Sequence, residues 1–199
     1  MDKPVPNATP QQQAPLDANA WVEAAFDALA EGGIEAVRVD PLAKRLGVTR
    51  GSFYWHYKDR DALHQAMLRA WRERASYTVF SRVERSSENA GARLERLLAL
   101  PYSSPRSARA AAIELAIRLW ARRDKSAAKA VRHIDRTRLD YFEKLLREHG
   151  VAEAEARDRA FLFYAVLMAE AFIVDGRQAT ERALAKALLT SSGGVNGSD

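Results

Sequence analysis

The sequence predicts an all-α protein of about nine helices, and three observations lead to that fold class. Ala, Leu, Arg and Glu dominate the 199 residues and favour helices, whereas no alternating β-branched run predicts a strand. Apolar residues recur at three- and four-residue spacing. Capping residues and glycines separate the periodic stretches. Residues 1–16 and 191–199 are instead rich in Pro, Gln, Ser and Gly, and we expect both to be disordered.

The first four predicted helices lie close together between residues 17 and 86. Gly32-Gly33 ends the first helix, because glycine accepts the positive φ of a helix end. Asp40 is the expected N-cap of the second helix, which stops at Gly47. Thr49 and Asp59 are the expected caps of the third and fourth helices. The predicted ranges are 17–31, 40–46, 50–57 and 59–86.

Five further helices are predicted after residue 89. Helix 152–174 is apolar on almost every side from residue 160 onward, so it needs cover on two faces. This apolar stretch of 15 residues contains Glu170. We expect a buried helix, because spanning a bilayer takes about 20 apolar residues. The predicted ranges are 90–100, 106–122, 124–149, 152–174 and 178–190.

The composition excludes several classes of chemistry. The chain has no cysteine, which excludes disulfides, thiolate metal sites and cysteine nucleophiles. Its four histidines lack metal-ligand spacing, and the sequence contains no glycine-rich phosphate loop and no nucleophile elbow. No secretion signal is visible. We therefore expect a cytoplasmic protein that is not an enzyme and holds no metal or other cofactor.

The positive charge of the chain is concentrated in one window. The net charge is +5, which by itself is a weak indication of an anionic partner. Residues 1–37 carry one basic and six acidic side chains, whereas residues 38–58 carry five basic side chains and only Asp40 as an acid. The window at 38–58 is therefore the expected contact with nucleic acid.

Residues 40–57 have the layout of a helix-turn-helix, in which a glycine-containing turn joins two short helices. The turn is formed by residues 46–49, and the small Ala43 allows the helices to cross closely. Side chains spaced to bury one face are Leu42, Leu46, Val48, Phe53 and Tyr57. The second helix then presents outward Gly51, Ser52 and Trp55, flanked by Tyr54 and His56. Small and hydrogen-bonding residues of this kind, between Arg50 and Lys58, suit a DNA groove.

The segment from Gly33 to Leu63 resembles the N-terminal DNA-binding domain of the tetracycline-repressor (TetR) family. The resemblance rests on the aromatic end of the recognition helix, FYWHY at 53–57, and on the capped start of the next helix, KDRDAL at 58–63. It covers about residues 17–70. Departures from the family pattern are Val39, Asp40-Pro41 and Arg60, and we expect the first of them to remove one phosphate contact.

The resemblance implies a DNA-binding domain at residues 17–64 and a ligand-binding and dimerisation domain at 65–190. Residues implied to face bases are Arg50, Gly51, Ser52, and Trp55 or His56. Residues implied to hold phosphates are Arg38, Lys44, Thr49, Tyr54 and Lys58. Packing against the first helix is the alternative for Trp55 and His56, and a solvated face is the alternative for Lys44 and Arg45. A homodimer through residues 152–190 is also implied, in agreement with the two-sided apolar helix.

Large side chains of the C-terminal part are candidates either for the core or for the wall of a cavity that holds an unidentified small-molecule effector. The candidate ligand-binding residues are Trp71, Tyr102, Arg118, Trp120, His133, Phe142, Phe163 and Tyr164. Asp135 and Arg138 are further polar candidates. Burial beside a neighbouring acid is the alternative for His133.

The leading interpretation is a dimeric, sequence-specific transcriptional regulator, and most simply a repressor. It would bind a palindromic operator in double-stranded DNA and leave it when the effector binds. The alternatives are a non-specific DNA-binding protein, an enzyme, and a helical module that has lost its DNA contacts. The modest charge of the 38–58 window argues against non-specific binding, and the absence of catalytic motifs argues against an enzyme. The joint presence of Arg50, Tyr54 and Lys58 argues against lost DNA contacts.

Overall fold

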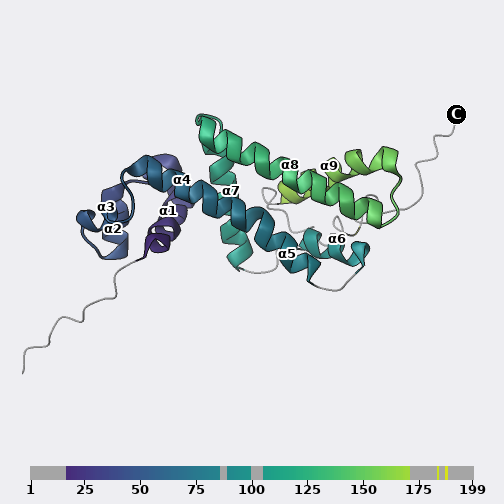
Figure 1. Cartoon of the computed structure of the whole chain (residues 1–199), viewed down its shortest axis with the longest axis horizontal. Helices are drawn as coiled ribbons and strands as arrows, with labels where there is room; N and C mark the ends of the chain where they lie inside the picture. Colours follow the sequence, from purple (N-terminus) through teal and green to yellow (C-terminus); the bar gives the residue numbers. More distant parts are fainter. Residues whose placement is uncertain (1–16, 86–88, 100–104, 171–182, 184–186, 188–199) are drawn as a thin grey trace, which may run out of the picture.

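The computed structural model describes residues 17–85, 89–99, 105–170, 183 and 187, and every regular element in this part of the chain is helical (Figure 1). The predicted all-α class is therefore confirmed. The predicted helix 178–190 falls largely on residues outside the described ranges. The elements are α1 (Ala18–Gly32), a 3-10 turn (Ile34–Ala36), α2 (Val39–Leu46), α3 (Arg50–Tyr54), α4 (Arg60–Arg72), a π-helical segment (Glu73–Thr78), α5 (Val79–Glu84), α6 (Ala90–Ala99), α7 (Pro105–Trp120), α8 (Lys125–Glu148) and α9 (Glu153–Glu170).

The first three helices form one end of the molecule, and α4 leads from them toward the remaining helices, where α8 and α9 pack side by side (Figure 1). Aspartate side chains cap the starts of α1 and α4, and the predicted cap at Asp59 is confirmed. Thr49 is the N-cap residue of α3, but its side chain makes no capping hydrogen bond. The Asp59 carboxylate accepts from the Ala62 amide at 2.8 Å, and Asp17 accepts from the Ala20 amide at 2.8 Å. Gly47 ends α2 with φ of +68°, a left-handed conformation that glycine adopts without strain.

Two helix boundaries of the helix-turn-helix differ from the prediction. Arg38 is the N-cap of α2, so Asp40 lies inside the first turn and is not the cap. The helical hydrogen bonding of α3 ends at Tyr54, although the amides of His56 and Tyr57 still donate to the Phe53 carbonyl at 3.0 Å. A tight turn after α3 therefore replaces its last predicted residues and brings Tyr57 back under the helix.

The predicted long helix 59–86 is interrupted by the π-helical segment Glu73–Thr78. The Ser76 hydroxyl donates to the Arg72 carbonyl at 2.8 Å. Arg138 of α8 donates to the Ala75 carbonyl through Nε at 3.3 Å and Nη2 at 3.2 Å. Side chains thus occupy carbonyl groups that a regular α-helix uses for its own ladder, which accounts for the irregular turn.

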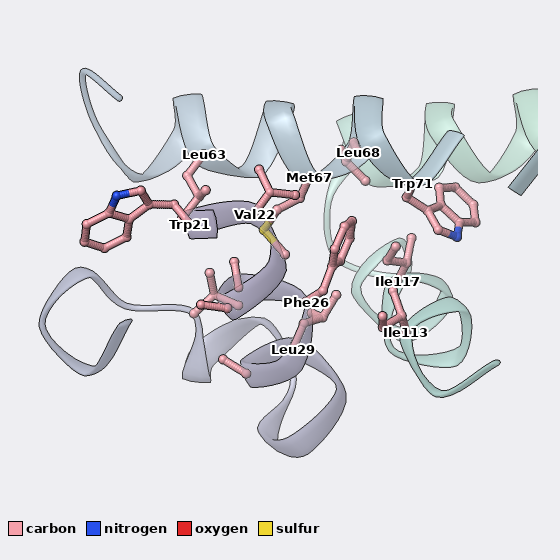
Figure 2. Close-up of a cluster of buried hydrophobic side chains, with 14 of the residues drawn as sticks. Trp21, Val22, Phe26, Leu29, Leu63, Met67, Leu68, Trp71, Ile113 and Ile117 are labelled. Carbon is pink, nitrogen blue, oxygen red and sulfur yellow. The ribbon is translucent and has the colours of Figure 1, made fainter. Parts of the chain in front are cut away.

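A first hydrophobic core joins α1 to α4, α7 and the start of α8. Figure 2 shows α1 beneath α4, with α7 beside both, and their apolar side chains meet in the space between them. The expected domain boundary at residues 64–65 falls inside α4, where Leu63 and Met67 are both buried in this core. The labelled members are Trp21, Val22, Phe26, Leu29, Leu63, Met67, Leu68, Trp71, Ile113 and Ile117.

A second core lies between α5, α6, α8 and α9, and includes Leu94, Phe142, Leu145 and Phe163. α8 contributes to both cores, because its early residues pack on the first and its later residues on the second. Among the helices of the described residues, none combines the length and the apolar character needed to cross a bilayer.

Candidate functional site

The short helix α3 is fastened to α1 by aromatic side chains on one face. Phe53 is fully buried, and its ring meets the Trp21 ring edge-on with centroids 5.2 Å apart. Tyr57 packs on Phe53 at 5.6 Å, and its hydroxyl donates to the Ala18 carbonyl at 2.8 Å. The position and rotation of α3 are therefore set by the core, and the opposite face is free for another contact.

That opposite face carries large aromatic groups in water. Trp55 is 88% exposed and Tyr54 is 50% exposed, so neither ring is part of the core. Packing of Trp55 against α1, one of the two interpretations of the sequence, is not observed. A surface tryptophan of this exposure beside basic side chains is typical of a contact site. Of the other predicted DNA-facing residues, Ser52 is half-buried. The exposed ones are Arg38, Lys44, Thr49, Arg50, Gly51, His56 and Lys58.

Arg50, the first residue of α3, is held by two neighbours. Its Nη1 lies 3.6 Å from the Asp40 carboxylate of α2, and its Nη2 donates to the Tyr54 hydroxyl at 3.3 Å. The hydrogen bond to Tyr54 and the charge of Asp40 raise the pKa of Arg50, so it stays cationic. Arg45 instead pairs with Glu31 at the end of α1, whereas Lys44 points to solvent. Of these two basic residues, Lys44 is thus the better placed for phosphate.

The junction between the helix-turn-helix end and the later helices contains a neutral histidine. His64 of α4 accepts from Arg60 Nε at 3.2 Å, and its ring meets Trp120 of α7 edge-on at 5.1 Å. Burial lowers the pKa of His64, and the Arg60 charge lowers it further. Arg60 also donates to the Ile34 carbonyl at 2.7 Å, so this departure from the family pattern braces the turn after α1.

Five polar side chains converge between α7, α8 and α9, and we call them the charge cluster: Glu114, Arg118, Asp135, Arg138 and Tyr164. Glu114 is buried and accepts from Arg138 at 2.7 and 2.8 Å. It also accepts from Arg118 at 2.9 and 3.1 Å. Arg118 reaches Asp135 at 2.6 Å, and the Tyr164 hydroxyl donates to Asp135 at 2.7 Å. Every charge in the cluster therefore has an opposite charge as a hydrogen-bond partner.

The protonation states of the charge cluster follow from these contacts. Burial alone would raise the pKa of Glu114, but the charges and hydrogen bonds of Arg138 and Arg118 outweigh it, so the net shift is downward. Burial raises the pKa of Tyr164 to about 12, and the two arginines oppose this shift only partly. At neutral pH Glu114 is therefore an anion between two cations, and Tyr164 is a neutral phenol.

Hydrogen bonds and ion pairs connect the charge cluster with α1 through the π-helical segment. Arg138 donates to the Ala75 carbonyl. Arg74, the residue before Ala75 in the chain, pairs with Glu23 of α1. Arg109 of α7 pairs with Glu23 at 3.1 Å and with Asp27 at 2.6 Å. A continuous set of polar contacts thus runs from the interior of the later helices to the helix that carries α3.

The structure distributes the predicted ligand-binding residues among different environments. Trp71 and Trp120 are buried in the first core, and Phe142 and Phe163 in the second. Arg118 and Tyr164 belong to the charge cluster with Asp135 and Arg138. His133 is exposed, so burial beside an acid, the alternative for this residue, is wrong. Tyr102 lies outside the described residues.

Sequence reasoning missed Glu114, the residue at the centre of the charge cluster. Its spacing of four residues from Arg118 is the available signal, because such a pair shares one helix face. That spacing alone does not distinguish a buried pair from a solvated one. Within the described ranges, no three His, Asp or Glu side chains are grouped as a metal site would require.

Two comparisons with known sequences match the N-terminal part of the chain. The family described as "Bacterial regulatory proteins, tetR family" matches residues 22–67, which reach from α1 into α4. Tetracycline repressor protein class A from transposon 1721 of Escherichia coli is 40% identical over 57 residues, which are 27% of this chain and 26% of that repressor. The match to this curated relative thus spans about a quarter of its length.

Solved structures resemble the chain over most of its length. A transcriptional regulator from Rhodococcus sp. Rha1 has a TM-score of 0.68 at 24% identity, over 88% of this chain and 92% of that chain. A putative transcriptional regulator from Saccharomonospora viridis, solved in complex with choline, has a TM-score of 0.67 at 18% identity, over 86% and 92%. At these identities the likeness establishes the shared fold.

The described residues thus form an N-terminal helix-turn-helix with an exposed face on α3, followed by helices α5 to α9. The part of the chain that matches the TetR family of bacterial regulatory proteins is this helix-turn-helix region, residues 22–67.

Proposed function

We propose that this protein is a homodimeric, sequence-specific transcriptional repressor that leaves a palindromic operator when a small-molecule effector binds. The observation that carries the proposal is α3, which is fixed to α1 by Phe53 and presents Arg50, Tyr54 and Trp55 to solvent. A rigid helix with exposed hydrogen-bonding and aromatic groups at a basic edge is suited to a major groove. The partner is double-stranded DNA, in the cytoplasm.

At the operator, one set of residues would contact bases and another would contact phosphates. Arg50, Ser52 and His56 can hydrogen-bond to base edges, and Gly51 permits close approach. Lys44, Lys58, Arg38, Thr49 and Tyr54 would bind phosphates and fix the register of the protein on the duplex. In a dimer, two copies of α3 would enter successive major grooves about 34–36 Å apart, which requires a palindromic site.

The homodimer is supported by apolar side chains on the surface of α9. Phe161 is 61% exposed and Leu162 is 53% exposed, and both lie within the expected interface at 152–190. Adjacent large apolar groups in water favour burial against a second copy. The double variant Phe161→Glu, Leu162→Glu is expected to shift the protein from dimer to monomer in sedimentation velocity. A wild-type protein that is a stable monomer at micromolar concentration would contradict the dimer.

The effector response is supported by the charge cluster and its contact with the π-helical segment. A polar effector that pairs with Arg118, Asp135 or Tyr164 changes the partners of Arg138 and therefore its bond to the Ala75 carbonyl. Because Arg74 in the same segment is paired with α1, this change would alter the position of α3, and operator affinity would fall by linkage. The Saccharomonospora viridis relative was solved with choline. That complex supports a small effector as a class.

Selection of duplexes from a random pool tests the DNA-binding function directly. We expect a palindromic consensus, and Arg50→Ala is expected to weaken binding to the selected duplex by about 1–3 kcal/mol. Arg122→Ala is the matched control, because it removes an exposed arginine in the turn after α7, away from α3 in the sequence. No consensus, or equal losses in the two variants, would contradict this function. Repeating the selection with a small-molecule library present identifies compounds that release the duplex.

A further inference from the structure

Asp40 is an acidic side chain within the basic window at residues 38–58. It is the only acid among residues 38–58, and its carboxylate is largely exposed in the first turn of α2. A carboxylate facing a phosphate is repelled, so this residue opposes the contacts on which sequence-independent DNA binding depends.

The ion pair with Arg50 gives Asp40 a role at the DNA-facing surface. Asp40 contacts Nη1 of Arg50 at 3.6 Å, while the Tyr54 hydroxyl accepts from Nη2 at 3.3 Å. The guanidinium is therefore held from two sides, by one residue of α2 and one of α3. Arginine has five N–H donors in a planar fork, so these contacts leave other donors for a base edge.

The two effects of Asp40 differ between specific and non-specific complexes. In a non-specific complex the protein contacts phosphates, and the carboxylate only repels them. In a specific complex Arg50 faces a base, and the carboxylate holds the guanidinium in place, which reduces the side-chain entropy lost on binding. Asp40 therefore weakens the first complex more than the second.

We propose that Asp40 is a specificity-determining residue, which positions Arg50 for base contact and at the same time disfavours binding to duplexes of other sequence. The proposal rests on the DNA-binding function proposed above. It assigns Asp40 no direct base contact, because the pairing with Arg50 is what connects it to sequence recognition.

Comparison of Asp40→Asn with wild type tests the proposal. Fluorescence anisotropy measures the Kd for the duplex selected by wild type and for a random duplex of equal length, at one stated salt concentration. We expect Asp40→Asn to bind the random duplex about fivefold more tightly, the size expected for one exposed charge contact. Binding to the selected duplex is expected to change less or to weaken. The ratio of the Kd for the random duplex to the Kd for the selected duplex is therefore expected to fall, and to fall by about fivefold where binding to the selected duplex is unchanged.

Two further variants separate positioning from a general charge effect. Asp61→Asn removes an exposed acid from the first turn of α4 and is expected to strengthen both complexes by the same factor. In an Arg50→Ala background, Asp40→Asn is expected to leave the specificity ratio almost unchanged, since other α3 residues supply what specificity remains. Equal strengthening of both complexes by Asp40→Asn, or an undiminished fall of the ratio without Arg50, overturns the proposal. If wild type selects no duplex at all, the DNA-binding function fails first.

Discussion

Replacement of Glu114 by glutamine tests whether the charge cluster holds the later helices together. Glu114 accepts four hydrogen bonds from two guanidinium groups, at 2.7, 2.8, 2.9 and 3.1 Å. Glutamine has nearly the same size, but it carries no charge, and its NH₂ group is a donor that would face the donors of Arg118 and Arg138. Arg118 would then keep Asp135 as its anionic partner, whereas half-buried Arg138 would lose its carboxylate partner.

The expected loss of stability is large for a single isosteric change. Removal of one partner from a buried ion pair costs about 3–5 kcal/mol, because a charge is left without its counter-charge. A domain of this size has a total free energy of unfolding of about 5–15 kcal/mol. With a change in Tm of about 2–4 °C per kcal/mol, Glu114→Gln is expected to lower the Tm by about 6–20 °C.

Urea denaturation at several pH values is the decisive assay. The pKa of Glu114 is lower in the folded protein than in the unfolded chain. Its stabilising contribution is therefore complete above the unfolded value of about 4.3 and is lost as the pH falls through the folded value. The difference between wild type and Glu114→Gln should be largest near neutral pH and should shrink below about pH 4.

Glu35→Gln is the matched control, because Glu35 forms an exposed pair with Arg123 at 3.8 Å. Exposed ion pairs contribute about 0–1 kcal/mol, so this variant should stay close to wild type. Equal effects of the two substitutions, or a Glu114→Gln difference independent of pH, would refute the reasoning about the charge cluster.

Two further predictions concern the helix-turn-helix itself. Phe53→Ala should destabilise the protein by about 3–5 kcal/mol in urea denaturation and abolish operator binding, because the ring that seats α3 on α1 is removed. Phe53→Leu should cost much less, and a mild Phe53→Ala would show that α3 does not depend on this contact. Gly47→Ala should cost about 1–2 kcal/mol by the same measurement, since φ is +68° and a Cβ there meets no neighbour within 4 Å, which leaves backbone strain as the only penalty. Gly47→Asn should cost less than Gly47→Ala, and the reverse order would exclude backbone strain as the cause.

The helix-turn-helix could be predicted from the sequence because its signals are local. The glycine turn at Gly47, the cap at Asp59 and the inward spacing of Phe53 and Tyr57 all act within a few residues of the chain. These local signals give wrong helix boundaries where a residue distant in the sequence bonds to the helix backbone. The π-helical segment is the main example, since Arg138, 63 residues further along the chain, occupies the Ala75 carbonyl.

By itself, the sequence determined the all-α class, the helix order and the outward face of α3, because periodicity and caps depend on neighbouring residues. Only the tertiary structure decided which charges meet. It joined Glu114 to Arg138 across two helices and Asp40 to Arg50 across the turn. The charge cluster could not be separated from solvated charges on the basis of the sequence, because burial and partner identity arise only when α7, α8 and α9 pack together.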